Sequence, residues 1–123
     1  MDIQMTTTDI SLSFGTACIC SGRLGDDISL LFWGGDRPHI GCTVMAVPRP
    51  SLTEDGSISV TSSVLNLTGH KDEHVCRLLA EEVCRQTGKT VVCTGGFHVD
   101  NITKTQIDEL LLRVREKAAG GFE

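Results

Sequence analysis

Aromatic residues are few in this chain of 123 residues, and it has no excess of basic ones. It has no tyrosine, one tryptophan and four phenylalanines. Its 11 lysines and arginines are outnumbered by 16 aspartates and glutamates, which gives a formal net charge of −5. Proteins that bind nucleic acid usually present a basic face with rings that stack on bases. The composition therefore excludes nucleic acid as an expected partner.

Long hydrophobic runs are also missing. No apolar stretch approaches the roughly 20 residues that a transmembrane helix needs. The N-terminus has neither the basic segment nor the hydrophobic core of a signal peptide. We therefore expect a cytoplasmic protein that has no membrane partner.

The six cysteines include no Cys-x-x-Cys pair. Four of them lie beside or within apolar runs, namely Cys18, Cys42, Cys76 and Cys93. A free cysteine in such a place behaves as a small hydrophobe. We expect buried, reduced thiols, with metal binding or redox chemistry as the alternative.

The N-terminal half alternates apolar and polar residues in the manner of β-strands. Four strands are expected, from Ile10 to about Cys20, Ile28 to Trp33, Cys42 to Val47 and Ser57 to Leu65, with a turn over residues 21–27. Short connections between them favour an antiparallel meander.

The hydrophobic period then changes to that of helices. Val75, Leu79 and Val83 recur at helical spacing, and Gly88 suits the left-handed position after a helix. Residues 90–94 form a β-branched run that follows this helix, so we expect a strand parallel to an earlier one.

A second helix is predicted by a capping box, in which Thr103 and Gln106 satisfy each other's backbone. It ends near Gly120. The whole pattern predicts an α+β fold with a single mixed sheet of about five strands, an antiparallel meander plus one crossover strand, and two helices on one face. The length predicts one domain over residues 1–123.

Two loops of matching construction follow predicted strands. Residues 34–41 are Gly-Gly-Asp-Arg-Pro-His-Ile-Gly, and residues 95–100 are Gly-Gly-Phe-His-Val-Asp. Paired glycines let a backbone approach a ligand closely, and histidine adds a donor, an acceptor, a base or a metal ligand. Taken singly, each loop is more typical of a plain turn with a rim histidine. Because both end core strands, we expect His39 and His98 to face one pocket.

Other polar residues gather near the start of the first helix. His70 and His74 are four residues apart, but without a third ligand such a pair is weak evidence for zinc. The charged residues of this helix are expected to form a solvated face; they are Lys71, Asp72, Glu73, Glu81 and Glu82.

Residues 34–41 and 96–107 resemble the LpdD-like prenylated flavin chaperones, the small D subunits of gallate-type hydroxyarylic acid decarboxylases. The resemblance covers about Leu30 to Leu112 and implies an LpdD-like domain over residues 1–123. It is clearest at Gly35, Pro38, His39, Ile40, Gly41, Gly96, His98, Val99, Ile102, Thr103 and Ile107. It assigns no role to the cysteines or to His70 and His74.

The resemblance implies a carrier of prenylated FMN or FMN, without catalytic residues, that delivers or shields the flavin for a prenylated-flavin-dependent decarboxylase. No nucleophile–base–orienter set in the sequence argues otherwise. A flavin prenyltransferase is a further expected partner. The expected cofactor-binding residues are Gly34, Gly35, Asp36, Arg37, Pro38, His39, Gly41, Gly95, Gly96, His98, Asp100, Asn101 and Lys104.

The flavin phosphate needs donors on a chain that is net acidic. We expect Arg37 and the backbone amides of the two glycine loops to be the main ones. Lys104 and the N-terminus of the second helix are secondary, because the capping box already uses amides there.

Two alternatives come from other functional classes. One is a metal-binding protein with His39 and His98 as ligands and Asp36 or Asp100 completing the shell, and such a divalent metal would also be able to bridge the flavin phosphate. The other is a small enzyme with His39 or His98 as general base. Strand edges in small sheets are often paired, which favours a homodimer.

Overall fold

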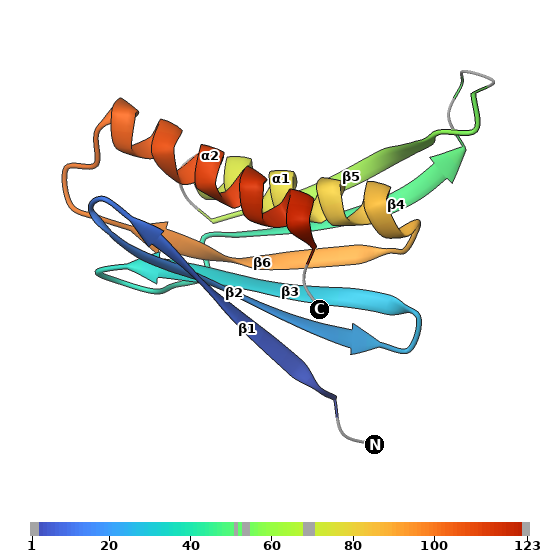
Figure 1. The fold of residues 1–123 in the computed structure, drawn as a ribbon, viewed down its shortest axis with the longest axis horizontal. Coiled ribbons are helices and arrows are strands. Elements are labelled where there is room, and N and C mark those ends of the chain that lie inside the picture. The colour runs from blue at the N-terminus through green and yellow to red at the C-terminus, as the bar shows by residue number, and fades with distance from the viewer. Residues whose placement is uncertain (1–2, 51, 53–54, 68–70, 122–123) are drawn as a thin grey trace.

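The computed structural model describes residues 3–50, 52, 55–67 and 71–121. Six strands and two helices follow one another along these residues (Figure 1). They are β1 (Met5–Leu12), β2 (Gly15–Leu24), β3 (Asp27–Gly35), β4 (Cys42–Pro50), β5 (Ile58–Asn66), α1 (Lys71–Thr87), β6 (Val91–His98) and α2 (Lys104–Gly120).

All six strands form one mixed sheet in the order β1-β2-β3-β6-β4-β5. Strand β6 pairs parallel with β3 and antiparallel with β4. Both helices lie over the same face of the sheet (Figure 1). The predicted α+β class, the mixed sheet and the parallel strand after the first helix are confirmed.

The sheet has six strands instead of about five, because the expected first strand is a hairpin of β1 and β2. The core residues change from even to odd numbers here: Ile10 is buried from β1, and Ala17 and Ile19 are buried from β2. A tight turn at residues 13 and 14 reverses the chain and causes this change. The next turn is shorter than expected, since β2 continues to Leu24 and β3 begins at Asp27.

The expected meander is interrupted between β3 and β4. These strands are not neighbours, because β6 lies between them. The segment from Asp36 to Gly41 carries the chain across the end of β6 before β4 begins. This crossing places the two glycine–histidine loops at the same end of the sheet.

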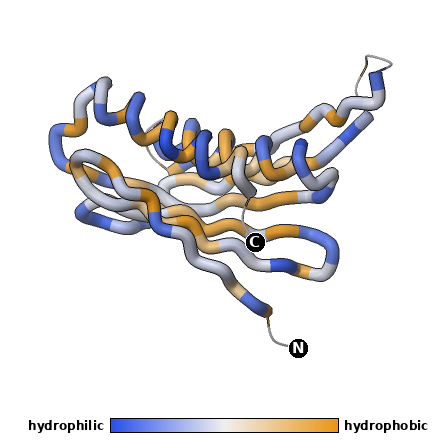
Figure 2. Tube along the Cα trace, in the orientation of Figure 1, coloured by the Kyte–Doolittle hydropathy of each residue, from blue (hydrophilic) through white to orange (hydrophobic). Residues whose placement is uncertain are grey.

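The core lies between the sheet and the two helices. Helix α1 buries Val75, Leu79 and Val83 at helical spacing. Hydrophobic and hydrophilic residues alternate along both helices in Figure 2. From the sheet side, the rings of Phe32 and Phe97 stack with centroids 6.4 Å apart. These rings anchor β3 and β6 just before the strands end.

The helix ends follow the predicted signals. Gly88 has φ +69° directly after α1, and its amide donates to the Cys84 carbonyl at 2.8 Å. The capping box of Thr103 and Gln106 is present at the start of α2.

Within the described part of the chain, neither helix is long and apolar enough to cross a membrane. All six cysteines are free thiols, and Cys18 alone among them is not buried.

Candidate functional site

The two glycine–histidine loops lie side by side because β3 and β6 are parallel and end together. Gly35 is the register partner of His98. The Asp36 amide donates to the His98 carbonyl at 2.7 Å, and the Gly41 amide donates to the Gly95 carbonyl at 2.9 Å. The β3–β4 loop is therefore fixed to β6 at both of its ends.

The imidazole rings of His39 and His98 meet edge to face. Their centroids are 6.5 Å apart and the rings are inclined by 77°. The structure thus brings together two histidines that are distant in the sequence. Gly96 makes room for this arrangement, since a Cβ there would lie 2.6 Å from His39 Nε2.

Asp72 is the residue of this site that the sequence analysis missed. It was expected on a solvated helix face, but it is only 5% exposed. Its Oδ2 lies 3.1 Å from His39 Nε2, and its Oδ1 accepts the Phe97 amide at 2.9 Å. One buried carboxylate of α1 therefore contacts both loops. Its spacing from Cys76 and Leu79 puts it on the buried stripe of the helix, which is the signal that identifies it in the sequence.

Lys71 is also not a solvated residue. Its Nζ donates to the Phe97 carbonyl, lies 3.7 Å from Asp72 Oδ1, and stands 5.6 Å from the centre of the Phe97 ring. The other acidic residues of α1 are paired as well. Glu73 and Glu81 flank Arg77 with N···O distances of 2.6 and 3.7 Å. The expected solvated face is therefore wrong at its N-terminal end and is an ion-pair network beyond it.

Both ring nitrogens of His39 face oxygen acceptors. Nδ1 lies 3.0 Å from the Arg37 carbonyl, and Nε2 faces the Asp72 carboxylate. Each ring nitrogen is thus directed at an oxygen of the protein itself. A ring engaged at both nitrogens presents neither of them to a substrate or a metal ion. This geometry argues against His39 as a general base.

His98 pairs with an exposed carboxylate on its own loop. Its Nε2 lies 2.8 Å from Asp100 Oδ1. This hydrogen bond, and then the positive charge of Arg37, hold the pKa of Asp100 below its ordinary value. The site therefore carries one ionised carboxylate at its rim at neutral pH.

Arg37 is the cation of the site that is most available to an anion. It is exposed, and its guanidinium donates no hydrogen bond to the described residues. Lys104, by contrast, pairs with Asp108 at 3.3 Å. The capping box uses the amide of Gln106. The amides of Asp36, Gly41 and Phe97 are also engaged within the protein, so the loop amides contribute less than expected.

The remaining predicted residues have different positions. Pro38 is exposed beside His39, and Asn101 follows β6 with φ +58°. Gly34 and Gly95 lie inside the sheet. A Cβ at Gly34 would lie 2.6 Å from the Thr16 carbonyl oxygen, and a Cβ at Gly95 would lie 1.6 Å from the Phe32 carbonyl oxygen. Strand packing explains these two glycines without a ligand.

The metal alternative has no support in the structure. Residues 3–50, 52, 55–67 and 71–121 contain no group of three or more histidines, cysteines, aspartates or glutamates that is arranged to hold a metal ion. His74 is exposed on α1, and His70 lies outside the described residues.

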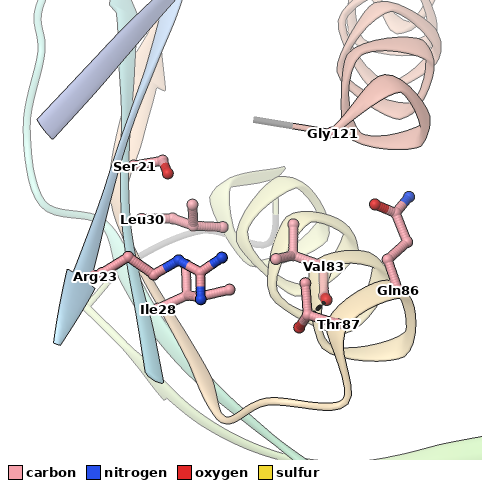
Figure 3. Close-up of a pocket in the computed structure, with 8 residues that line it drawn as sticks. All are labelled: Ser21, Arg23, Ile28, Leu30, Val83, Gln86, Thr87 and Gly121. Carbon is pink, nitrogen blue, oxygen red and sulfur yellow. Dashed lines mark hydrogen bonds between the residues drawn. The ribbon is translucent and has the colours of Figure 1, made fainter. Parts of the chain in front are cut away.

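Figure 3 shows a separate hollow. It lies where β3 begins, whereas the histidines lie at the ends of β3 and β6. It lies between the strand ends at Arg23 and Ile28 and the last turn of α1 at Val83 and Thr87. Its volume is about 70 Å³, which is room for roughly two water molecules. It is too small for a flavin.

The fold has a counterpart among solved structures. The crystal structure of a novel chaperone complex for yeast 20S proteasome assembly contains a chain that superposes with a TM-score of 0.64. The match covers 98% of this chain and 94% of that one. The sequences are 13% identical, so the likeness concerns the fold alone.

A closer relative in sequence is the protein LpdD of Lactiplantibacillus plantarum. It is 30% identical over 90 residues, which make up 68% of this chain and 58% of that protein. The chain thus spans less than two thirds of the length of this relative. In addition, residues 16–120 match the family described as the prenylated flavin chaperone LpdD-like domain. This match extends over most of the chain, and the chain belongs to that family.

Proposed function

We propose that the chain binds prenylated FMN at the paired glycine–histidine loops and delivers or shields it for a partner prenylated-flavin-dependent hydroxyarylic acid decarboxylase. Membership of a chaperone family supports an accessory role with a partner protein. The observation that carries the proposal is the convergence of His39 and His98, whose ring centroids are 6.5 Å apart, on loops that also carry the exposed Arg37. In this proposal residues 1–123 form one domain, and the protein acts in the cytoplasm.

The chemistry of the loops suits a flavin nucleotide. Arginine offers a planar fork that matches phosphate oxygens, and Pro38 restrains the backbone next to it. The histidine rings offer flat, polar surfaces on the same pair of loops. Because Asp72 and Phe97 hold the loops in place, the ligand meets a site that is already formed.

The small-enzyme alternative is less well supported by the site. A general base needs a nitrogen with a free lone pair within reach of a substrate proton. Both nitrogens of His39 face acceptors of the protein itself. His98 is hydrogen-bonded to Asp100 at the rim. These contacts favour binding over proton transfer.

The test is co-expression with a flavin prenyltransferase, anaerobic purification and native mass spectrometry. The wild type is expected to retain one prenylated FMN and to activate an apo-decarboxylase. The double variant His39→Ala/His98→Ala is expected to lose both properties. His74→Ala, which removes an exposed histidine of α1, is the matched control. A wild type that carries no flavin and activates no decarboxylase would overturn the proposal.

Two further partners belong to the proposal. The prenyltransferase is expected to be the donor of the flavin, and co-purification from the same cells tests this. A second copy of the chain is expected to pair along an open edge of the sheet, at β1 or β5. Light scattering after gel filtration measures whether the chain is a dimer.

A further inference from the structure

An apolar hollow lies next to the β3–β4 loop, where β4 begins and β5 ends. Its volume is about 230 Å³, and it is lined by Ile40, Cys42, Thr43, Leu65, Asn66 and Leu67. The pairing of Cys42 with Asn66 and the hydrogen bond from the Leu67 amide to the Gly41 carbonyl, 3.0 Å long, join its walls. Ile40 directly follows His39, so one wall of the hollow belongs to the proposed flavin site.

Three large aliphatic side chains are exposed around this hollow. Ile40 is 61% exposed, Leu65 76% and Leu67 72%. A single exposed aliphatic residue needs no explanation, but a contiguous apolar patch marks a binding surface. Because the three surround one depression, a ligand that enters it covers them together.

The lining of the hollow is uncharged. Cys42 is 1% exposed, and burial, followed by the neighbouring Cys76, raises the pKa of its thiol to about 12. The Asn66 amide donates to Glu73 Oε1 at 2.6 Å, so this polar group is already bonded within the protein. Among the described residues, an apolar group in the hollow therefore meets neither an ion nor an unpaired donor.

The size of the hollow limits what it can receive. Complete sites for small molecules have volumes of roughly 300–1,000 Å³. A hollow of about 230 Å³ fits a part of such a molecule. A prenylated flavin has a matching division, with an anionic phosphate at one end and a hydrocarbon-bearing ring at the other.

We infer that this hollow receives the prenyl-bearing ring end of the flavin, while Arg37 binds the phosphate. The inference rests on the proposed function and adds a selection step to it. Loops that hold only the phosphate would bind FMN and prenylated FMN equally. The aliphatic walls favour the prenylated form, because only that form brings extra hydrocarbon out of water.

The inference is tested by anaerobic binding of two probes, reduced prenylated FMN and reduced FMN. The wild type is expected to bind the prenylated probe about tenfold more tightly, the ratio for burying about two methylene groups. Leu65→Ser and Leu67→Ser should remove most of this preference, because they weaken binding of the prenylated probe far more than binding of reduced FMN. Leu112→Ser, at a leucine of α2 that is 52% exposed, is the control.

The binding results distinguish a failure of this inference from a failure of the proposed function. Variants that keep the wild-type preference, or that lose affinity for both probes equally, overturn the assignment of the hollow and leave the proposed function standing. A wild type that binds neither probe overturns the proposed function and the inference with it. Thermal melting of each variant shows that it is folded, which is expected because the substituted side chains are exposed.

Discussion

His39 Nε2 and Asp72 Oδ2 lie 3.1 Å apart, although the residues are 33 positions apart in the chain. The same carboxylate accepts the Phe97 amide. The first turn of α1 is thereby tied to the β3–β4 loop and to the end of β6. This buried carboxylate adds a side-chain contact to the backbone hydrogen bonds that hold the β3–β4 loop against β6.

Replacing Asp72 with alanine tests how much this carboxylate stabilises the fold. The change leaves the Phe97 amide and His39 Nε2 without their acceptor, and we expect a loss of about 3 kcal/mol in the free energy of unfolding. Urea denaturation measures it. Asp108→Ala is the control, because Asp108 pairs with Lys104 at the surface, and it should change stability by less than about 0.5 kcal/mol. An Asp72→Ala protein as stable as the wild type would show that the contacts of Asp72 do not contribute to the free energy of unfolding.

Gly96→Ala separates the position of the histidine ring from the chemistry of the ring. The new Cβ would lie 2.6 Å from His39 Nε2, so the ring must turn away from Asp72. We expect a loss of about 1 kcal/mol in stability, the value of one hydrogen bond, together with about tenfold weaker flavin binding. Calorimetric titration with reduced FMN measures the affinity. Gly120→Ala, where a Cβ meets nothing within 4 Å, should bind like the wild type. Unchanged flavin affinity in Gly96→Ala would contradict a role for the His39 ring in binding.

Arg37→Ala identifies the phosphate contact. Removal of the guanidinium should lower the affinity for FMN about tenfold or more and leave the affinity for riboflavin, which has no phosphate, unchanged. Fluorescence titration with both flavins measures the difference. Arg113→Ala on α2 serves as the charge-matched control. If Arg37→Ala weakens both flavins equally, or neither, the phosphate is bound elsewhere.

The titration of Asp100 reports its hydrogen bond with His98. The hydrogen bond from His98, and then the charge of Arg37, lower the pKa of Asp100 from its ordinary 3.8. A carboxylate with a lowered pKa stabilises the fold above its unfolded-state pKa and loses this contribution as the pH falls through its folded-state pKa. NMR of the Asp100 carboxyl carbon between about pH 2 and 6 should therefore show a titration midpoint below pH 3.8. In His98→Ala the midpoint should rise. An equal midpoint in both proteins would show that the hydrogen bond is absent in solution.

Much of the fold was predictable because its signals are local. The spacing of Val75, Leu79 and Val83, the glycine after α1 and the Thr103 capping box act within one or two turns. The first hairpin is hard to predict for a local reason too: residues 10–20 have the composition of one continuous strand, and only the change in core parity between Ile10 and Ala17 indicates the turn. The insertion of β6 between β3 and β4 depends on pairing between distant segments, which no single stretch of sequence specifies.

The site was predictable only in its loops. Their paired glycines and histidines stand out in the sequence, and the structure brings them together. Asp72 did not stand out, because a carboxylate in the first turn of a helix is usually solvated and interacts with the helix dipole. Its spacing from Cys76 and Leu79 indicates burial, but its partners His39 and the Phe97 amide come from distant segments that only the fold brings together. Likewise, the engagement of the Gly41 amide could not be foreseen, because its acceptor belongs to β6.

The most direct test of the central claim is NMR of the histidine side chains during flavin binding. The chain has four histidines, so ¹⁵N-labelled imidazoles give few signals. On anaerobic addition of reduced prenylated FMN to saturation, we expect the signals of His39 and His98 to shift together, while that of His74 stays in place. Saturation is established independently by the absorbance of the bound flavin. A bound flavin that leaves both His39 and His98 unshifted would contradict binding at the paired loops.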